Sequence, residues 1–104
     1  MLMSTYFILA NWTEQGIKAI KSSPKRLRAA KRLAKDCGVK FRSFHMTLGE
    51  YDIILRVEAP NDEAVARFTL ALGSAGNVRT TTLKGFTEQE YQKIMSYTRK
   101  LVMG

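Results

Sequence analysis

The stretch His45-Met46-Thr47-Leu48-Gly49-Glu50-Tyr51-Asp52-Ile53-Ile54 decides the fold, because its turn sets the register of two strands. A two-residue Gly-Glu loop suits a type II′ turn, in which the first central residue has a positive φ. Residues that face each other across such a hairpin share one face of the sheet. Counting back from the turn, the predicted pairs are Leu48 with Tyr51, Thr47 with Asp52, Met46 with Ile53, His45 with Ile54, Phe44 with Leu55 and Ser43 with Arg56.

The two faces of this hairpin differ in character. The predicted core face is apolar and holds Phe44, Met46, Leu48, Tyr51, Ile53, Leu55 and Val57. The opposite face mixes apolar and polar side chains, namely Phe41, Ser43, His45, Thr47, Asp52, Ile54 and Arg56. Such a face is too apolar for a solvated sheet and too polar for a core, which favours a binding surface. We therefore treat this second face as the candidate site.

Capping and chain-breaking residues locate the elements on either side of the hairpin. The alternation of apolar residues then separates strands from helices. The predicted elements are a strand over 5–11, a helix that opens at Glu14 behind the N-cap Thr13, a second helix with Ser23 as N-cap and Pro24 in its first turn that runs to about Asp36, strands over 39–48 and 51–58, a helix over 62–72, a strand over 78–85, and a C-terminal helix that starts in the capping box Thr87-Glu88-Gln89-Glu90.

This order, βαββαβ with a C-terminal helix, is that of a ferredoxin-like α+β fold, with helices on one face of a four-stranded antiparallel sheet. A chain of 104 residues is expected to form a single domain over 1–104. The second face of the sheet stays open. We therefore predict a homo-oligomer in which two such faces enclose a mixed cavity.

The charge of the chain is concentrated in one segment. The formal net charge is +8, and residues 18–42 hold ten basic side chains against one acidic residue, Asp36. Such a segment can follow nucleic-acid phosphates, or it can be a solvated helix face, and we favour the second interpretation. The apolar run 6–10 is too short to span a membrane and Cys37 is the only cysteine, so we expect a cytoplasmic protein that does not contact a membrane.

Several segments of the chain resemble the GYD domain family. They are Trp12-Thr13-Glu14-Gln15-Gly16-Ile17, Ser23-Pro24-Lys25-Arg26, Gly49-Glu50-Tyr51-Asp52, Leu72-Gly73-Ser74-Ala75-Gly76-Asn77-Val78-Arg79-Thr80 and Phe86-Thr87. The resemblance spans nearly the whole chain and implies a dimeric α/β barrel. The superfamily includes small cofactor-free monooxygenases, haem-degrading enzymes and ligand-sensing regulatory domains, but the family itself has no established function. Asn11, Arg26, Asp52 and Arg79 match its pattern, whereas most members have tyrosine in place of His45.

The first functional hypothesis is a binding or regulatory module that holds a small anionic or polar aromatic metabolite on the open face. Arg56, His45 and Asp52 supply polar contacts, with Phe41 and Ile54 as apolar walls. Arg26, at a helix N-terminus that favours an anion, is a further candidate. Arg79 either anchors an acidic group or pairs with Asp62 or Glu63.

The alternative is a small cofactor-independent oxygenase or isomerase. His45 would act as general base, and Asp52, diagonal to it, would orient the imidazole ring. One histidine with scattered acidic residues does not supply the ligands that zinc needs, so we expect neither a metal nor another cofactor. We expect Thr47 and His45 to be the hydrogen-bond partners of Asp52.

Overall fold

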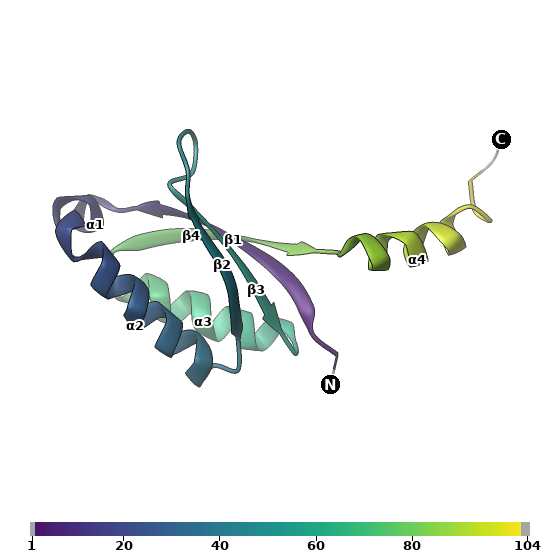
Figure 1. Ribbon diagram of the computed structural model, residues 1–104, viewed down its shortest axis with the longest axis horizontal. Helices are drawn as coiled ribbons and strands as arrows, with labels where there is room; N and C mark the ends of the chain where they lie inside the picture. Colours follow the sequence, from purple (N-terminus) through teal and green to yellow (C-terminus); the bar gives the residue numbers. More distant parts are fainter. Residues whose placement is uncertain (1, 103–104) are drawn as a thin grey trace.

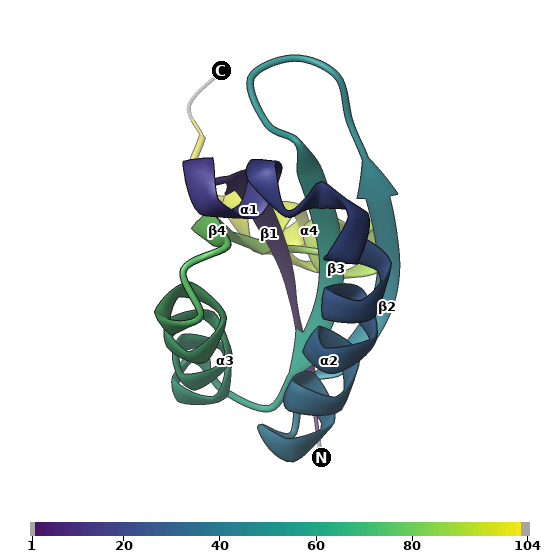
Figure 2. The ribbon, with the colours of Figure 1, turned by 90° about the vertical axis from the view of Figure 1, so that its left-hand side faces the viewer.

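The computed structural model describes residues 2–102 and consists of one sheet with two long helices against one of its faces (Figures 1 and 2). The fold is ferredoxin-like α+β, as the order of elements predicts. The elements are β1 (Ser4–Trp12), α1 (Glu14–Lys18), a 3-10 turn (Ile20–Ser22), α2 (Ser23–Asp36), β2 (Lys40–Met46), β3 (Ile53–Ala59), α3 (Asp62–Ser74), β4 (Val78–Gly85) and α4 (Glu88–Thr98).

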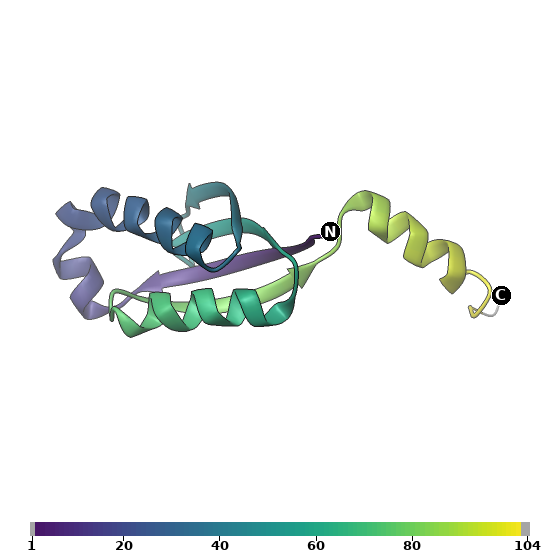
Figure 3. The same ribbon diagram turned by 90° about the horizontal axis from the view of Figure 1, so that it is seen from below.

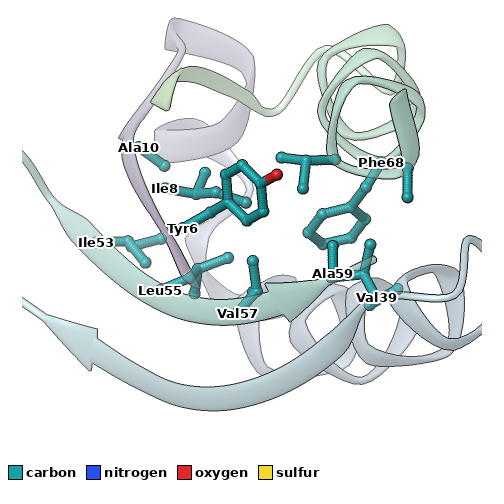
Figure 4. Packing of buried hydrophobic residues seen from close by; sticks show 12 residues of the cluster. Tyr6, Ile8, Ala10, Val39, Ile53, Leu55, Val57, Ala59 and Phe68 are labelled. Atoms are coloured by element: carbon teal, nitrogen blue, oxygen red, sulfur yellow. The ribbon is translucent and has the colours of Figure 1, made fainter. Parts of the chain in front are cut away.

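The four strands are antiparallel and lie in the order β2-β3-β1-β4. The two central strands are therefore β3 and β1, and their residues on the helix side form most of the core. Tyr6, Ile8 and Val57 are almost fully buried there, and Phe68 of α3 packs onto them (Figure 4). Burying such side chains is the main favourable contribution to folding.

Local capping residues start the helices where the sequence predicts them. The Thr13 hydroxyl accepts a hydrogen bond from the Gly16 amide, Asn61 caps α3 in the same way, and the capping box at Thr87 starts α4. One boundary differs by a residue, because Ser22 and not Ser23 is the N-cap position of α2. Helix ends commonly vary by this much.

The predicted hairpin register is confirmed. Met46 pairs with Ile53, His45 with Ile54, Phe44 with Leu55 and Ser43 with Arg56, and the Thr47 amide donates to the Asp52 carbonyl at 2.8 Å. Gly49 has a φ of +126°, in the region that side chains disfavour. The predicted burial of the hairpin tip is wrong, since Met46 and Leu48 are 63% and 94% exposed. The tip extends past the helices that would cover it (Figure 1).

The predicted position of Phe41 on the open face is also wrong. Phe41 pairs with Val57 and Ser43 with Arg56, so Arg42 is an extra residue in a β-bulge of β2. The bulge shifts the alternation by one, and both Phe41 and Phe44 then face the helices. The Lys31 ammonium of α2 lies 5.6 Å from the centre of the Phe41 ring.

The last helix, α4, stands away from the sheet and the other helices (Figure 3). Three of its large apolar side chains, Tyr91, Ile94 and Tyr97, are 43–64% exposed. An isolated helix of this length is marginal in water without tertiary packing. The apolar side of α4 therefore lacks a packing partner within the described part of the chain.

Candidate functional site

The segment after β1 is locked to the loop before β4. The Thr13 amide donates to the Asn77 carbonyl at 3.0 Å, and its hydroxyl donates to the Gly76 carbonyl. The side-chain amide of Gln15 donates hydrogen bonds to the Ala75 carbonyl and to the side-chain oxygen of Asn77. A Cβ atom on Gly16 would lie 2.0 Å from the Asn77 carbonyl oxygen, so only glycine permits this approach. Two segments that carry the family resemblance thus hold each other in place.

Asp52 secures the start of β3 to the end of β1. Its carboxylate accepts a hydrogen bond of 3.0 Å from the Trp12 amide, and its own amide donates to the Ala10 carbonyl. The Thr47 hydroxyl instead donates to the Tyr51 carbonyl. The expectation that Thr47 and His45 are the partners of the Asp52 carboxylate is therefore wrong. The carboxylate oxygen bonds to the Trp12 amide instead, and this bond extends the hydrogen bonding between β1 and β3 by one.

Arg26 closes the end of α1. Its guanidinium donates to the Ala19 carbonyl at 2.8 Å and to the Gly16 carbonyl at 3.1 Å. Both acceptors are neutral carbonyl groups. Among residues 2–102, no carboxylate lies within ion-pair distance of the Arg26 guanidinium. Arg26 lies on the helix side of the molecule, away from the open face.

The open face of the sheet has an apolar centre and a polar border. Phe7 lies between Arg56 and Leu83, and Leu9 between Ile54 and Thr81. Gly85 leaves room for the Phe7 ring, which a Cβ there would meet at 2.6 Å. The border consists of Asn11, Ser43, His45, Arg56, Glu58, Arg79 and Thr81.

Of the residues predicted for this face, His45, Ile54 and Arg56 are on it together, on neighbouring strands. Arg79 lies across the sheet, opposite Asn11. It does not pair with Asp62, which lies on the helix side and pairs with Lys84. Sequence reasoning missed Phe7, Leu9 and Leu83, although the alternation along 5–11 places the first two on one face.

A separate cleft of about 220 Å³ lies on the helix side, between α2, α3 and the sheet. Alanines line it from both helices, and Phe41 and Phe44 close one side. Its polar groups are Arg26, Ser23, Asn77 and Thr80. The sequence did not indicate this cleft, because it arises from the spacing of two helices that are far apart in the chain.

A third polar cluster joins α3 to the edge of the sheet. The Tyr6 hydroxyl donates to the Asp62 carboxylate, which also pairs with the Lys84 ammonium at 3.4 Å. Burial of the phenol and the neighbouring carboxylate raise the pKa of Tyr6 to about 12. The hydrogen bond from Tyr6, and then the charge of Lys84, lower the pKa of Asp62. This cluster links the first residue of α3 to β1 and β4.

Between residues 2 and 102, no three His, Cys, Asp or Glu side chains gather in a way that would hold a metal ion. No helix in the same part of the chain has the length and apolar character needed to cross a membrane.

Fold and motif contacts together define a small ferredoxin-like α+β protein in which the 12–17 and 72–80 family segments meet at one end of the sheet. The model of the GYD domain family matches residues 6–95, and the chain belongs to that family. It is 35% identical over 83 residues to the glutamine synthetase and cystathionine beta-lyase binding protein of Thermus thermophilus. That alignment covers 79% of this chain and 87% of the relative.

Two solved structures share the fold. The crystal structure of MtbAldR superposes with a TM-score of 0.63 at 20% identity, over 82% of this chain and 52% of the other. A homoserine dehydrogenase from Thiobacillus denitrificans has a TM-score of 0.56 at 13% identity, over 80% of this chain and 17% of the enzyme. The chain thus spans only about half, or less, of these two proteins, and the likeness concerns the fold alone.

Proposed function

We propose that this protein is a single-domain, cytoplasmic binding protein that regulates metabolic enzymes by docking onto them. The observation that carries the proposal is the 35% identity, over most of both chains, to a protein named for binding glutamine synthetase and cystathionine beta-lyase. The polar contacts support a binding role more than catalysis, because the Asp52 carboxylate is bonded to the Trp12 amide and not to His45.

The open face would be covered by a second copy of the chain. Phe7, Leu9, Ile54 and Leu83 form a contiguous apolar centre, and the exposed apolar side of α4 follows directly after β4. Contiguous apolar side chains that are only partly covered, with Leu83 49% exposed, favour an interaction surface. A two-fold arrangement would bury both the face and α4, and it corresponds to the dimeric barrel that the family resemblance implies.

The outer side of α2 would then remain free for the enzyme. It is predominantly basic: Arg28, Arg32 and Lys35 are exposed there, and the one acidic residue of α2, Asp36, is exposed at its C-terminal end. In the described chain, the ion pairs involve Lys18, Arg42 and Lys84 and leave these three without a carboxylate. A surface of this kind complements an acidic patch and accelerates association with it.

Binding to purified glutamine synthetase and cystathionine beta-lyase from the same organism tests the proposal. We expect biolayer interferometry to give a Kd of about 10 μM or tighter for at least one of them. The Arg28→Glu variant should weaken binding several-fold, and raised salt should do the same. The matched control, Arg67→Glu on the outer side of α3, should bind normally. Failure of both enzymes to bind at about 50 μM would contradict the proposal.

A further inference from the structure

We propose that the cleft between α2 and α3 binds a small anion with an apolar body, with its negative group at Arg26 and its body against Phe41 and Phe44. This site lies on the opposite side of the sheet from the open face. It goes beyond the proposed enzyme-binding function and does not depend on it.

The shape of the cleft favours a small occupant. Alanines line it from both sides, Ala29 and Ala30 from α2, Ala71 from α3 and Ala75 just after α3, and these short side chains leave space above the sheet. The floor consists of Ile8, Ala10 and Leu55 from the central strands. A volume of about 220 Å³ is below the range of roughly 300–1,000 Å³ that is usual for drug-sized ligands. A metabolite of about ten non-hydrogen atoms fits this space.

The charge at the cleft selects an anion. Arg26 lines the cleft, and its two hydrogen bonds go to the neutral carbonyls of Gly16 and Ala19. A guanidinium has five N–H donors, so donors remain after these two bonds. Arg26 is half-buried, and no carboxylate is within ion-pair distance of it in residues 2–102. A ligand carboxylate would supply the missing negative charge in a partly dry setting.

The start of α2 adds to this preference. Arg26 is in the first turn of a 14-residue helix, and no side chain caps that turn. The Ser23 amide already donates to the Ile20 carbonyl and Pro24 has no N–H, so the contribution of this end is chiefly the helix dipole, which favours negative charge. Asn77, Thr80 and Ser23 add neutral polar groups to the lining, and among residues 2–102 no acidic side chain lines the cleft. The rest of the lining is apolar, which accounts for an apolar body on the ligand.

Titration with matched probes tests the site by ¹⁵N NMR on the intact chain. The probes are 3-phenylpropionate and its neutral analogue 3-phenylpropan-1-ol, which differ mainly in charge. We expect the carboxylate to bind about tenfold more tightly, because a charge-assisted hydrogen bond replaces a neutral one. The largest shifts should fall on α2, α3 and Phe41. Equal affinity of the two probes, no binding, or shifts confined to the open face would overturn the proposal.

Variants of the cleft test separately whether probe binding depends on its charge and on its shape. Arg26→Gln should abolish the preference for the carboxylate, Arg26→Lys should retain part of it, and Arg67→Gln outside the cleft should leave both affinities unchanged. Ala71→Phe should fill the cleft and block both probes. If Arg26→Gln fails to fold, the proposal is still tested by the Ala71→Phe variant and by the difference in affinity between the two probes for the natural chain. Unchanged probe binding in Ala71→Phe would contradict the assignment even if enzyme binding by the protein is intact.

Discussion

The Asp52 carboxylate acts as a backbone acceptor where β3 begins beside β1. Its removal leaves the Trp12 amide without a partner in a half-buried setting. We expect Asp52→Ala to lower the free energy of unfolding by about 1–2 kcal/mol, the range for losing a hydrogen bond to a charged group at a partly exposed position. Glu50→Ala at the exposed turn should change it by less than about 0.5 kcal/mol. Urea unfolding of both variants measures the two free-energy changes. Equal changes would show that the hydrogen bond between Asp52 and the Trp12 amide does not stabilise the fold.

Tyr6 makes stability depend on alkaline pH. Its pKa is raised from 10.0 in the unfolded chain to about 12 in the fold, so the protonated phenol is favoured by folding. This contribution is fully present below pH 10 and is lost as the pH rises towards 12. The loss amounts to about 1–2 kcal/mol, less than the full value at about 1.4 kcal/mol per pH unit, because the Asp62 carboxylate is largely exposed and solvent screens its charge.

The Tyr6→Phe variant is the control for this pH effect. It should be about 1 kcal/mol less stable at pH 7, because the hydrogen bond to Asp62 is gone. Between pH 10 and 12 its stability should fall less than that of the natural chain. Urea midpoints measured across this pH range test the prediction, and parallel curves for the two proteins would argue against it.

At the level of elements, the lock between α1 and the loop before β4 depends on Gly16. A side chain there would meet the Asn77 carbonyl, and backbone atoms would have to move. We expect Gly16→Ala to destabilise the protein by about 2–3 kcal/mol, as overpacking does. Gly73→Ala is the matched control, since a Cβ in this part of α3 meets no atom within 4 Å. It should stabilise by about 0.4–1 kcal/mol in thermal or urea unfolding. Similar effects at both glycines would contradict the lock.

The elements show where prediction from the sequence succeeds. The register of β2 and β3 could be predicted because Gly49 restricts the turn and the register propagates from it along the strands. Phe41 was misplaced because a bulge depends on the whole sheet and its core. Its spacing of three residues from Phe44 was the available signal, because two aromatic residues at odd spacing can share one face only across an irregularity.

For the whole molecule, the fold was more predictable than the candidate site. The ferredoxin-like order follows from local signals, and the open face follows from that order. The partners of Asp52 and Arg26 are backbone groups, which a residue pattern does not reveal. The cleft depends on how far apart α2 and α3 pack, which is a property of the assembled core.

Whether the open face pairs with a second copy is tested most directly by sedimentation equilibrium at tens of micromolar. The apolar centre of the open face and the exposed side of α4 predict a particle of at least twice the mass of one chain. The Leu83→Asp variant, which puts a charge on that face, should shift the equilibrium towards the monomer. Leu70→Asp, at an exposed position on α3, should leave it unchanged. A natural chain that sediments as a monomer at these concentrations would contradict the prediction.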